Sequence, residues 1–120
     1  MKTFNSIKLY LYYFTSAIAI GAFGAHGVKG KISDALFETF KTGSLYHLLA
    51  AVFMITIVLY ANVKEKDFSM PLSVMLLGNI IFSFNCYLYA VTSIKFFAMI
   101  IPIGGVLMII SPLLISKRIE

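Results

Sequence analysis

The sequence carries little charge, has no tryptophan and contains one cysteine. Only 12% of its 120 residues are charged, whereas 60% are hydrophobic, and the mean hydropathy is +0.92. A soluble domain is charged at about one residue in four. The single cysteine, Cys86, excludes a disulfide within the chain. This composition predicts a protein that is solvated mainly by lipid.

Acidic residues are absent from every long apolar stretch. The stretches without charge cover residues 9–28, 42–63, 68–94 and 96–116. About 20 mainly apolar residues in a helix cross the roughly 30 Å hydrocarbon core of a bilayer, so each stretch is long enough to span it. All five acids lie outside these stretches. Their absence disfavours ion-coupled transport, because proton relays and cation-selective rings use ionisable groups inside the membrane.

These stretches predict an all-α fold, an integral membrane four-helix bundle that forms a single membrane domain over residues 1–120. We expect the spans at about 7–25, 44–62, 71–92 and 96–115. The charged segment between the first two spans has apolar residues at a helical spacing of four, which predicts a short amphipathic surface helix at about 33–42. Ser33 is its expected cap, and Thr42-Gly43 its expected end.

Basic residues at the ends of the spans predict the orientation. Six of them lie on the side of the two termini, at Lys2, Lys8, Lys64, Lys66, Lys117 and Arg118. Four lie on the other side, at Lys29, Lys31, Lys41 and Lys95. The positive-inside rule therefore places both termini in the cytoplasm. Because the charges flank the spans and form no basic stripe, we expect no nucleic-acid partner.

Small residues in the spans predict close helix packing, because they let backbones approach each other. They are Ala17, Gly21, Gly24, Ala25, Gly78, Gly104 and Gly105. A functional alternative for the first glycines is a site where backbone amides meet a phosphate or a lipid headgroup. No strand precedes them, which excludes a nucleotide-binding loop.

Polar residues also occur inside the third span, at Asn79, Ser83, Cys86 and Asn85. The first three share one stripe of the helix, and Asn85 lies on a neighbouring stripe. Polar side chains in hydrocarbon require hydrogen-bond partners, so we expect these residues to face other helices or another subunit. The alternative is a solvated pathway.

The two histidines lie at the predicted end of the first span and start of the second, on the same side of the membrane. His26 and His47 are candidates for metal or haem ligation or for pH sensing. Without a nearby carboxylate or thiolate the pair is an incomplete site, so we expect interfacial hydrogen bonding, no metal and no cofactor. No catalytic motif is present, and we expect neither catalytic residues nor an enzyme.

Five ordered motifs resemble the YgdD/YwdK family of small bacterial inner-membrane proteins, which is related to the eukaryotic transmembrane protein 256 group. They are Gly21-Ala-Phe-Gly-Ala-His26, Phe40-x-Thr42-Gly43-x-x-Tyr46-His47, Gly78-x-x-x-Phe82-Ser83, Tyr87-Leu88-x-Ala90-x-Thr92 and Pro102-Ile103-Gly104-Gly105. The resemblance implies four helices and a plasma-membrane location. It indicates no particular activity, because the family is functionally uncharacterised. The sequence departs from the family at Ala50, where relatives often have histidine, and at Ser111-Pro112, where many have Gly-Trp.

We therefore expect a non-enzymatic envelope accessory or lipid-contacting protein, with membrane lipids and either a second copy or another membrane protein as partners. The candidate functional face comprises His26, Thr42, Gly43, Tyr46 and His47. One alternative is a passive pore or carrier for a small solute, formed by a homo-oligomer around the polar stripe of the third span. Another is haem or metal binding through the histidine pair.

Overall fold

Long helices account for nearly all of the computed structural model, which describes residues 3–119 and the side chains from residue 7 onward. The elements in order are α1 (Thr3–Phe23), the π-helical turn η1 (Gly24–Val28), α2 (Asp34–Lys64), α3 (Ser69–Asn79), the π-helical turn η2 (Ile80–Phe84), α4 (Asn85–Thr92) and α5 (Lys95–Arg118). Within this described part of the chain, four stretches are long and apolar enough to cross a membrane, at Ile7–Val28, Asp34–Lys64, Ser69–Thr92 and Lys95–Arg118. The predicted all-α architecture with four long apolar helices is confirmed.

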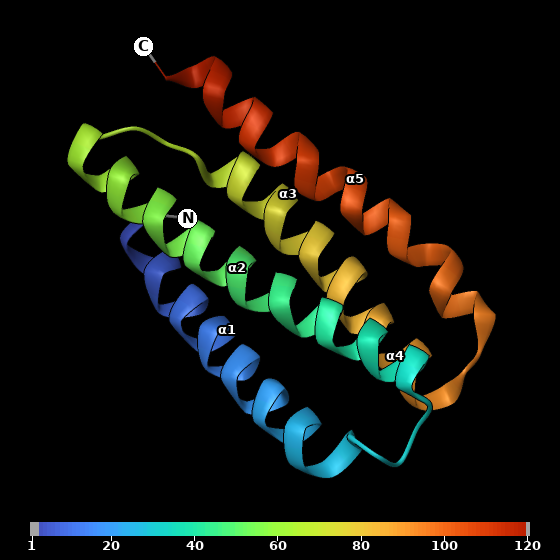
Figure 1. Cartoon of the computed structure of the whole chain (residues 1–120). Coiled ribbons are helices and arrows are strands. Elements are labelled where there is room, and N and C mark those ends of the chain that lie inside the picture. Colours follow the sequence, from blue (N-terminus) through green and yellow to red (C-terminus); the bar gives the residue numbers. More distant parts are fainter. Residues whose placement is uncertain (1–2, 120) are drawn as a thin grey trace.

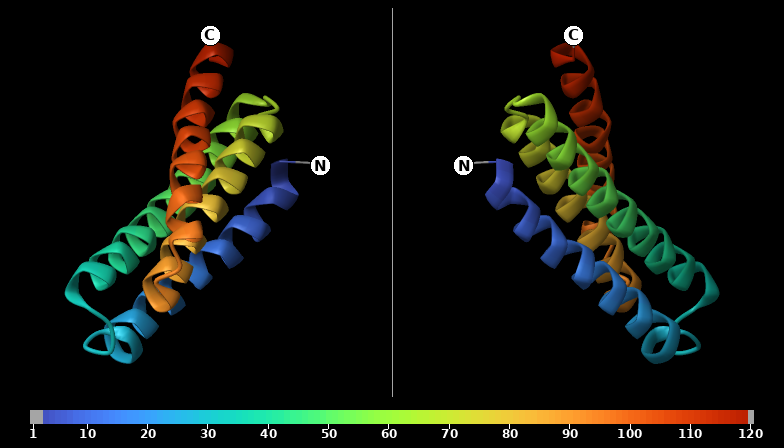
Figure 2. Two further views of the ribbon diagram at one scale, coloured as in Figure 1. Left: turned by 90° about the vertical axis from the view of Figure 1, so that its right-hand side faces the viewer. Right: turned by 90° about the vertical axis from the view of Figure 1, so that its left-hand side faces the viewer.

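The helices alternate in direction and pack as two antiparallel pairs. α1 packs mainly on α2, and α3 packs mainly on α5. α2 also contacts α3, η2 and α4, so it lies between α1 and the third long helix (Figure 1). Seen from the side, α5 is inclined to α1 and α2 (Figure 2). This arrangement makes α2 the element that connects the two pairs.

The prediction of a separate surface helix between the first two spans is wrong. Ser33 caps a helix as expected, because its hydroxyl accepts a hydrogen bond from Leu36 N at 3.2 Å. That helix continues through Thr42 and Gly43 to Lys64 as α2. Thr42 is held in the helix by a 3.0 Å bond from its hydroxyl to Glu38 O. Gly43 permits close packing here, and it does not end the helix.

α2 is longer than a bilayer is thick. Its 31 residues extend about 46 Å at 1.5 Å per residue, against roughly 30 Å of hydrocarbon. The charged residues of its first turns, Asp34, Glu38 and Lys41, are all exposed. The charged start of α2, from Asp34 to Lys41, therefore suits the headgroup layer, and the uncharged stretch that follows is long enough to cross the hydrocarbon core.

The connection between α2 and α3 is short and locally stabilised. α2 ends where Glu65 adopts a left-handed conformation at φ 53°. Asp67 Oδ1 then accepts hydrogen bonds from the Ser69 amide at 2.9 Å and the Ser69 hydroxyl at 2.6 Å. These two bonds favour the ionised carboxylate and lower the pKa of Asp67.

The interior contains two apolar clusters with polar side chains between them. One cluster lies toward the termini and comprises Tyr10, Ala50, Met54, Val58, Ala61, Phe68, Leu72, Met75 and Ile115. The other lies toward the segment that joins η1 to α2 and comprises Val28, Phe40, Tyr87 and Ala90. Along α2 and along the third long helix, the buried polar residues His47, Asn79 and Ser83 fall between the positions of the two clusters.

Two adjacent glycines of α5 provide a test of helix packing. A Cβ on Gly104 would lie 2.5 Å from Gly78 O, whereas a Cβ on Gly105 would lie 3.7 Å from the Phe82 ring. We expect Gly104→Ala to lower the free energy of unfolding by about 1–3 kcal/mol, because backbone atoms must move apart. Gly105→Ala is the matched control and should be neutral or stabilising by up to about 1 kcal/mol. Unfolding in detergent micelles measures both, and equal effects would contradict the packing.

Candidate functional site

A layer of hydrogen-bonded polar side chains, here called the polar layer, separates the two apolar clusters. Its centre is His47 of α2, which is fully buried. His47 Nε2 lies 3.0 Å from Ser16 Oγ of α1, and His47 Nδ1 lies 2.9 Å from the Tyr87 hydroxyl of α4. The Tyr13 ring packs against the imidazole at 4.4 Å between centroids. One imidazole therefore connects three of the four long helices.

The bonding pattern assigns the protons on His47. The Ser16 hydroxyl donates its single proton to Tyr13 O at 2.6 Å. Ser16 Oγ must therefore accept from His47, so the proton lies on Nε2. Nδ1 is then an acceptor for the Tyr87 hydroxyl. The geometry is complete for a neutral imidazole and leaves neither ring nitrogen free.

Asn79, the last residue of α3, holds the other half of the polar layer. The Tyr13 hydroxyl donates to Asn79 Oδ1. Asn79 Nδ2 donates to Tyr46 O at 3.0 Å and to Ser83 Oγ at 3.2 Å. The Ser83 hydroxyl in turn donates to Gly43 O at 2.8 Å. The polar layer thus comprises Tyr13, Ser16, Gly43, Tyr46, His47, Asn79, Ser83 and Tyr87.

Gly43 makes this bonding possible. A Cβ at this position would lie 2.6 Å from the Cβ of Cys86 and 3.0 Å from Ser83 O. The third long helix therefore packs directly on the backbone of α2 at this residue. η2 begins after Asn79, and its wider turn carries Ser83 to the Gly43 carbonyl.

The polar layer is saturated. In the part of the chain that the structure describes, every buried side-chain nitrogen and oxygen has a hydrogen-bond partner. Asn79 and Ser83 face helices of their own chain, and Cys86 is buried beside them. Asn85 lies outside the layer and bonds to Ile81 O at 2.6 Å. The predicted polar stripe of the third span is therefore an internal bonding surface, and these contacts do not form a pathway through the subunit.

The structure does not bring the two histidines together. Ser16 lies beside His47, and His26 follows Ser16 by ten residues, about 15 Å along a helix. His26 is exposed on η1, whereas His47 is buried. The sequence places both histidines at span ends on the same side of the membrane, which leaves open whether they meet. In the structure α2 begins at Asp34, so His47 lies well inside the helix. No cluster of three metal-ligating side chains occurs among the described residues.

The other residues of the candidate face divide between two surfaces of α2. Thr42 and Tyr46 are exposed and, with Phe82 and Met108, line a groove of about 510 Å³ between α2 and α5. Tyr46 packs edge-on against Phe82 at 5.3 Å between centroids. Gly43 and His47 point into the bundle. The five predicted residues therefore do not form one continuous face.

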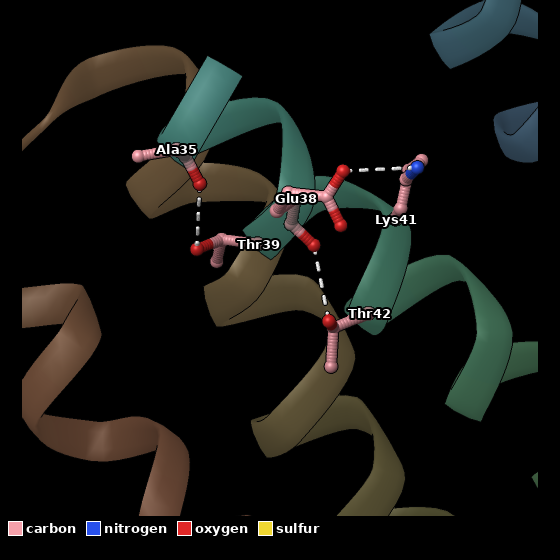
Figure 3. Close-up of polar contacts among 5 residues, drawn as sticks. All are labelled: Ala35, Glu38, Thr39, Lys41 and Thr42. Atoms are coloured by element: carbon pink, nitrogen blue, oxygen red, sulfur yellow. Dashed lines mark hydrogen bonds and ion pairs between the residues drawn. The ribbon is translucent and has the colours of Figure 1, made fainter. Parts of the chain in front are cut away.

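A second groove lies on the opposite side of α2, between it and the end of α1. Its volume is about 330 Å³. This α1–α2 groove is lined by Gly21, Gly24, Ala25, Phe37, Phe40, Lys41, Ser44, Leu45 and Leu48. Lys41 points toward α1, whereas Thr39 and Thr42 lie on the other side of α2 (Figure 3). Sequence patterns missed the α2 lining residues, because only the register between α1 and α2 brings them opposite Gly21 and Gly24.

The small residues expected at helix contacts lie in three different environments. Gly24 is covered by the Phe40 ring, and Gly21 lies beside the Ser44 hydroxyl. Ala17 is buried, whereas Ala25 is exposed at the groove. The remaining three, Gly78, Gly104 and Gly105, lie between the third long helix and α5.

Four apolar helices of membrane-spanning length, three of them joined by the polar layer, define a small multi-spanning membrane protein. Residues 20–105 match the family described as protein of unknown function (DUF423). The chain belongs to this family, whose curated members carry the name UPF0382 membrane protein.

Relatives in Bacillus and Staphylococcus match most of the chain. The UPF0382 membrane protein YwdK of Bacillus subtilis is 36% identical over 101 residues, which cover 82% of each chain. A UPF0382 membrane protein of Staphylococcus aureus, SAB0533, is 34% identical over 94 residues, which cover 78% of this chain and 77% of the relative. No solved structure matches the chain.

Two asparagines test the role of the polar layer. We expect Asn79→Ala to lower the free energy of unfolding by about 1–3 kcal/mol, because it removes the acceptor of the Tyr13 hydroxyl and the hydrogen bonds that Asn79 donates to Tyr46 O and Ser83 Oγ. Asn85→Ala is the matched control and should cost less, since Asn85 bonds only within its own helix. Reversible unfolding in mixed micelles compares them, and equal losses would contradict a special role for Asn79.

Proposed function

We propose that this protein is a non-enzymatic, lipid-contacting accessory protein of the plasma membrane, and that the α1–α2 groove holds an acyl chain of one membrane lipid. The observation that carries the proposal is the groove itself. Its lining is mainly apolar, and Gly21, Gly24 and Ala25 leave its floor without long side chains. An extended hydrocarbon chain fits such a surface better than a polar solute does.

The size and depth of the groove support this occupant. Its volume of about 330 Å³ lies at the small end of the range for ligand pockets, which is about 300–1,000 Å³. That space suits a segment of one acyl chain. The lining begins at Phe37 and Lys41 near the charged start of α2, and it continues to Leu45 and Leu48 in the uncharged stretch. A lipid in the groove would therefore have its headgroup beside the charged start of α2 and its acyl chain beside the uncharged stretch.

The saturated polar layer supports a non-enzymatic, non-conducting role. Catalysis and solute transport both use polar groups that reach a substrate. Here His47, Asn79 and Ser83 use their hydrogen-bonding groups on neighbouring helices. The surface grooves remain as the places where another molecule can bind.

Two neighbouring alanines test the groove. Ala25 lines it, whereas Ala22, also exposed, does not. We expect wild-type protein released from nanodiscs to retain one lipid, and Ala25→Phe to reduce the retained fraction about tenfold. Displacing two buried methylenes at about 0.8 kcal/mol each accounts for that loss. Native mass spectrometry measures the retained lipid and the number of subunits together.

Ala22→Phe is the control and should retain lipid as the wild type does. The acyl-chain proposal is overturned if the wild type retains no lipid, or if Ala25→Phe retains as much as Ala22→Phe.

We also propose that both termini lie in the cytoplasm, so that the α1–α2 groove opens toward the outer leaflet. Lys31 and Lys64 are exposed near opposite ends of α2, and the native Cys86 is buried. In intact cells a membrane-impermeant maleimide should label Lys31→Cys several times more than Lys64→Cys, because only the former would face outward. Permeabilised cells should label both equally. The reverse pattern would overturn the orientation.

A further inference from the structure

We infer that Lys41 makes the α1–α2 groove selective for anionic phospholipids, by holding the headgroup phosphate at the mouth of the groove. This inference rests on the proposed function, in which the groove holds the acyl chain. It adds the chemical class of the lipid and the residue that recognises it.

The position of Lys41 carries the inference. Lys41 is the one cationic residue among those that line the groove. Its Nζ lies 5.6 Å from the centroid of the Phe37 ring, and Phe37 is itself part of the groove wall. The aliphatic part of Lys41 can follow this apolar wall while the ammonium remains in the headgroup layer. A phosphate above the groove would therefore meet the ammonium directly.

Lys41 is also available to exchange partners. Lys41 pairs with Glu38, with 3.0 Å between Nζ and Oε2 (Figure 3). The side chains of Lys41 and Glu38 are 55% and 68% exposed, respectively. An exposed pair three residues apart on a helix contributes little stability, so a phosphate can replace the carboxylate at small cost.

The charges near the groove favour an anion. The segment between η1 and α2, which joins the two walls of the groove, carries Lys29 and Lys31, and both are exposed. Together with Lys41 they outnumber the two nearby acids, Asp34 and Glu38, by three to two. A phosphatidylglycerol headgroup has a net negative charge that this excess attracts, whereas phosphatidylcholine has a cation that Lys41 repels.

The experiment uses the full-length protein in nanodiscs that contain equal amounts of phosphatidylglycerol and phosphatidylcholine. Native mass spectrometry reports which lipid remains on the protein. We expect the wild type to retain phosphatidylglycerol about fivefold more often than phosphatidylcholine, the preference that one lysine near a membrane surface supplies. Lys41→Gln should retain a lipid but lose this preference.

Two further variants separate the pairing from the charge. Glu38→Gln removes the competing carboxylate, so its preference for phosphatidylglycerol should exceed that of the wild type. Lys64→Gln removes the same charge at the other end of α2, where Lys64 is also exposed, and should leave the preference unchanged.

Each failure has its own signature. Lipid retained without preference by the wild type, or a preference that survives Lys41→Gln, overturns the role of Lys41 and leaves the acyl-chain groove in place. A preference lost equally in Lys64→Gln also overturns it, since general surface charge then explains the selection. A wild-type protein that retains no lipid overturns the proposed function and this inference together.

Discussion

The need to satisfy polar groups inside hydrocarbon governs how this bundle packs. Water is absent there, so His47, Asn79 and Ser83 are buried only because each finds partners on another helix. Those partners include backbone carbonyls of Tyr46 and Gly43, which fixes the depth at which the third long helix lies on α2. Apolar side chains contact lipid and protein with similar free energies. The polar hydrogen bonds therefore do much to fix how the helices are positioned against each other.

The polar layer also sets the surface of the protein. With Ser16 beside His47, antiparallel packing places Gly21 beside Ser44 and Gly24 beside Phe40. These contacts form the floor of the α1–α2 groove. On the other side of α2, the groove with α5 forms where Tyr46 meets Phe82. The polar layer therefore determines which residues are neighbours in the surface grooves.

Several features were predictable from local patterns because they depend on local physics. Ser33 caps α2 through its own hydroxyl, and the packing of Asn79 and Ser83 against other helices follows from the cost of polar groups in hydrocarbon. Gly43 was misread as a helix end, because glycine weakens helices in general. Its real neighbours are Cys86 and Ser83, which are 40 or more residues away in the chain.

The sequence by itself determined that the protein is a membrane protein with four helices long enough to span a bilayer, because bilayer thickness alone sets how many uncharged residues a span requires. Family membership was also readable from ordered motifs, since these are local strings. Only the tertiary structure decided that His26 and His47 stay apart and that Lys41 borders a groove. Both depend on the register between α1 and α2, which long-range hydrogen bonds select and no local pattern encodes.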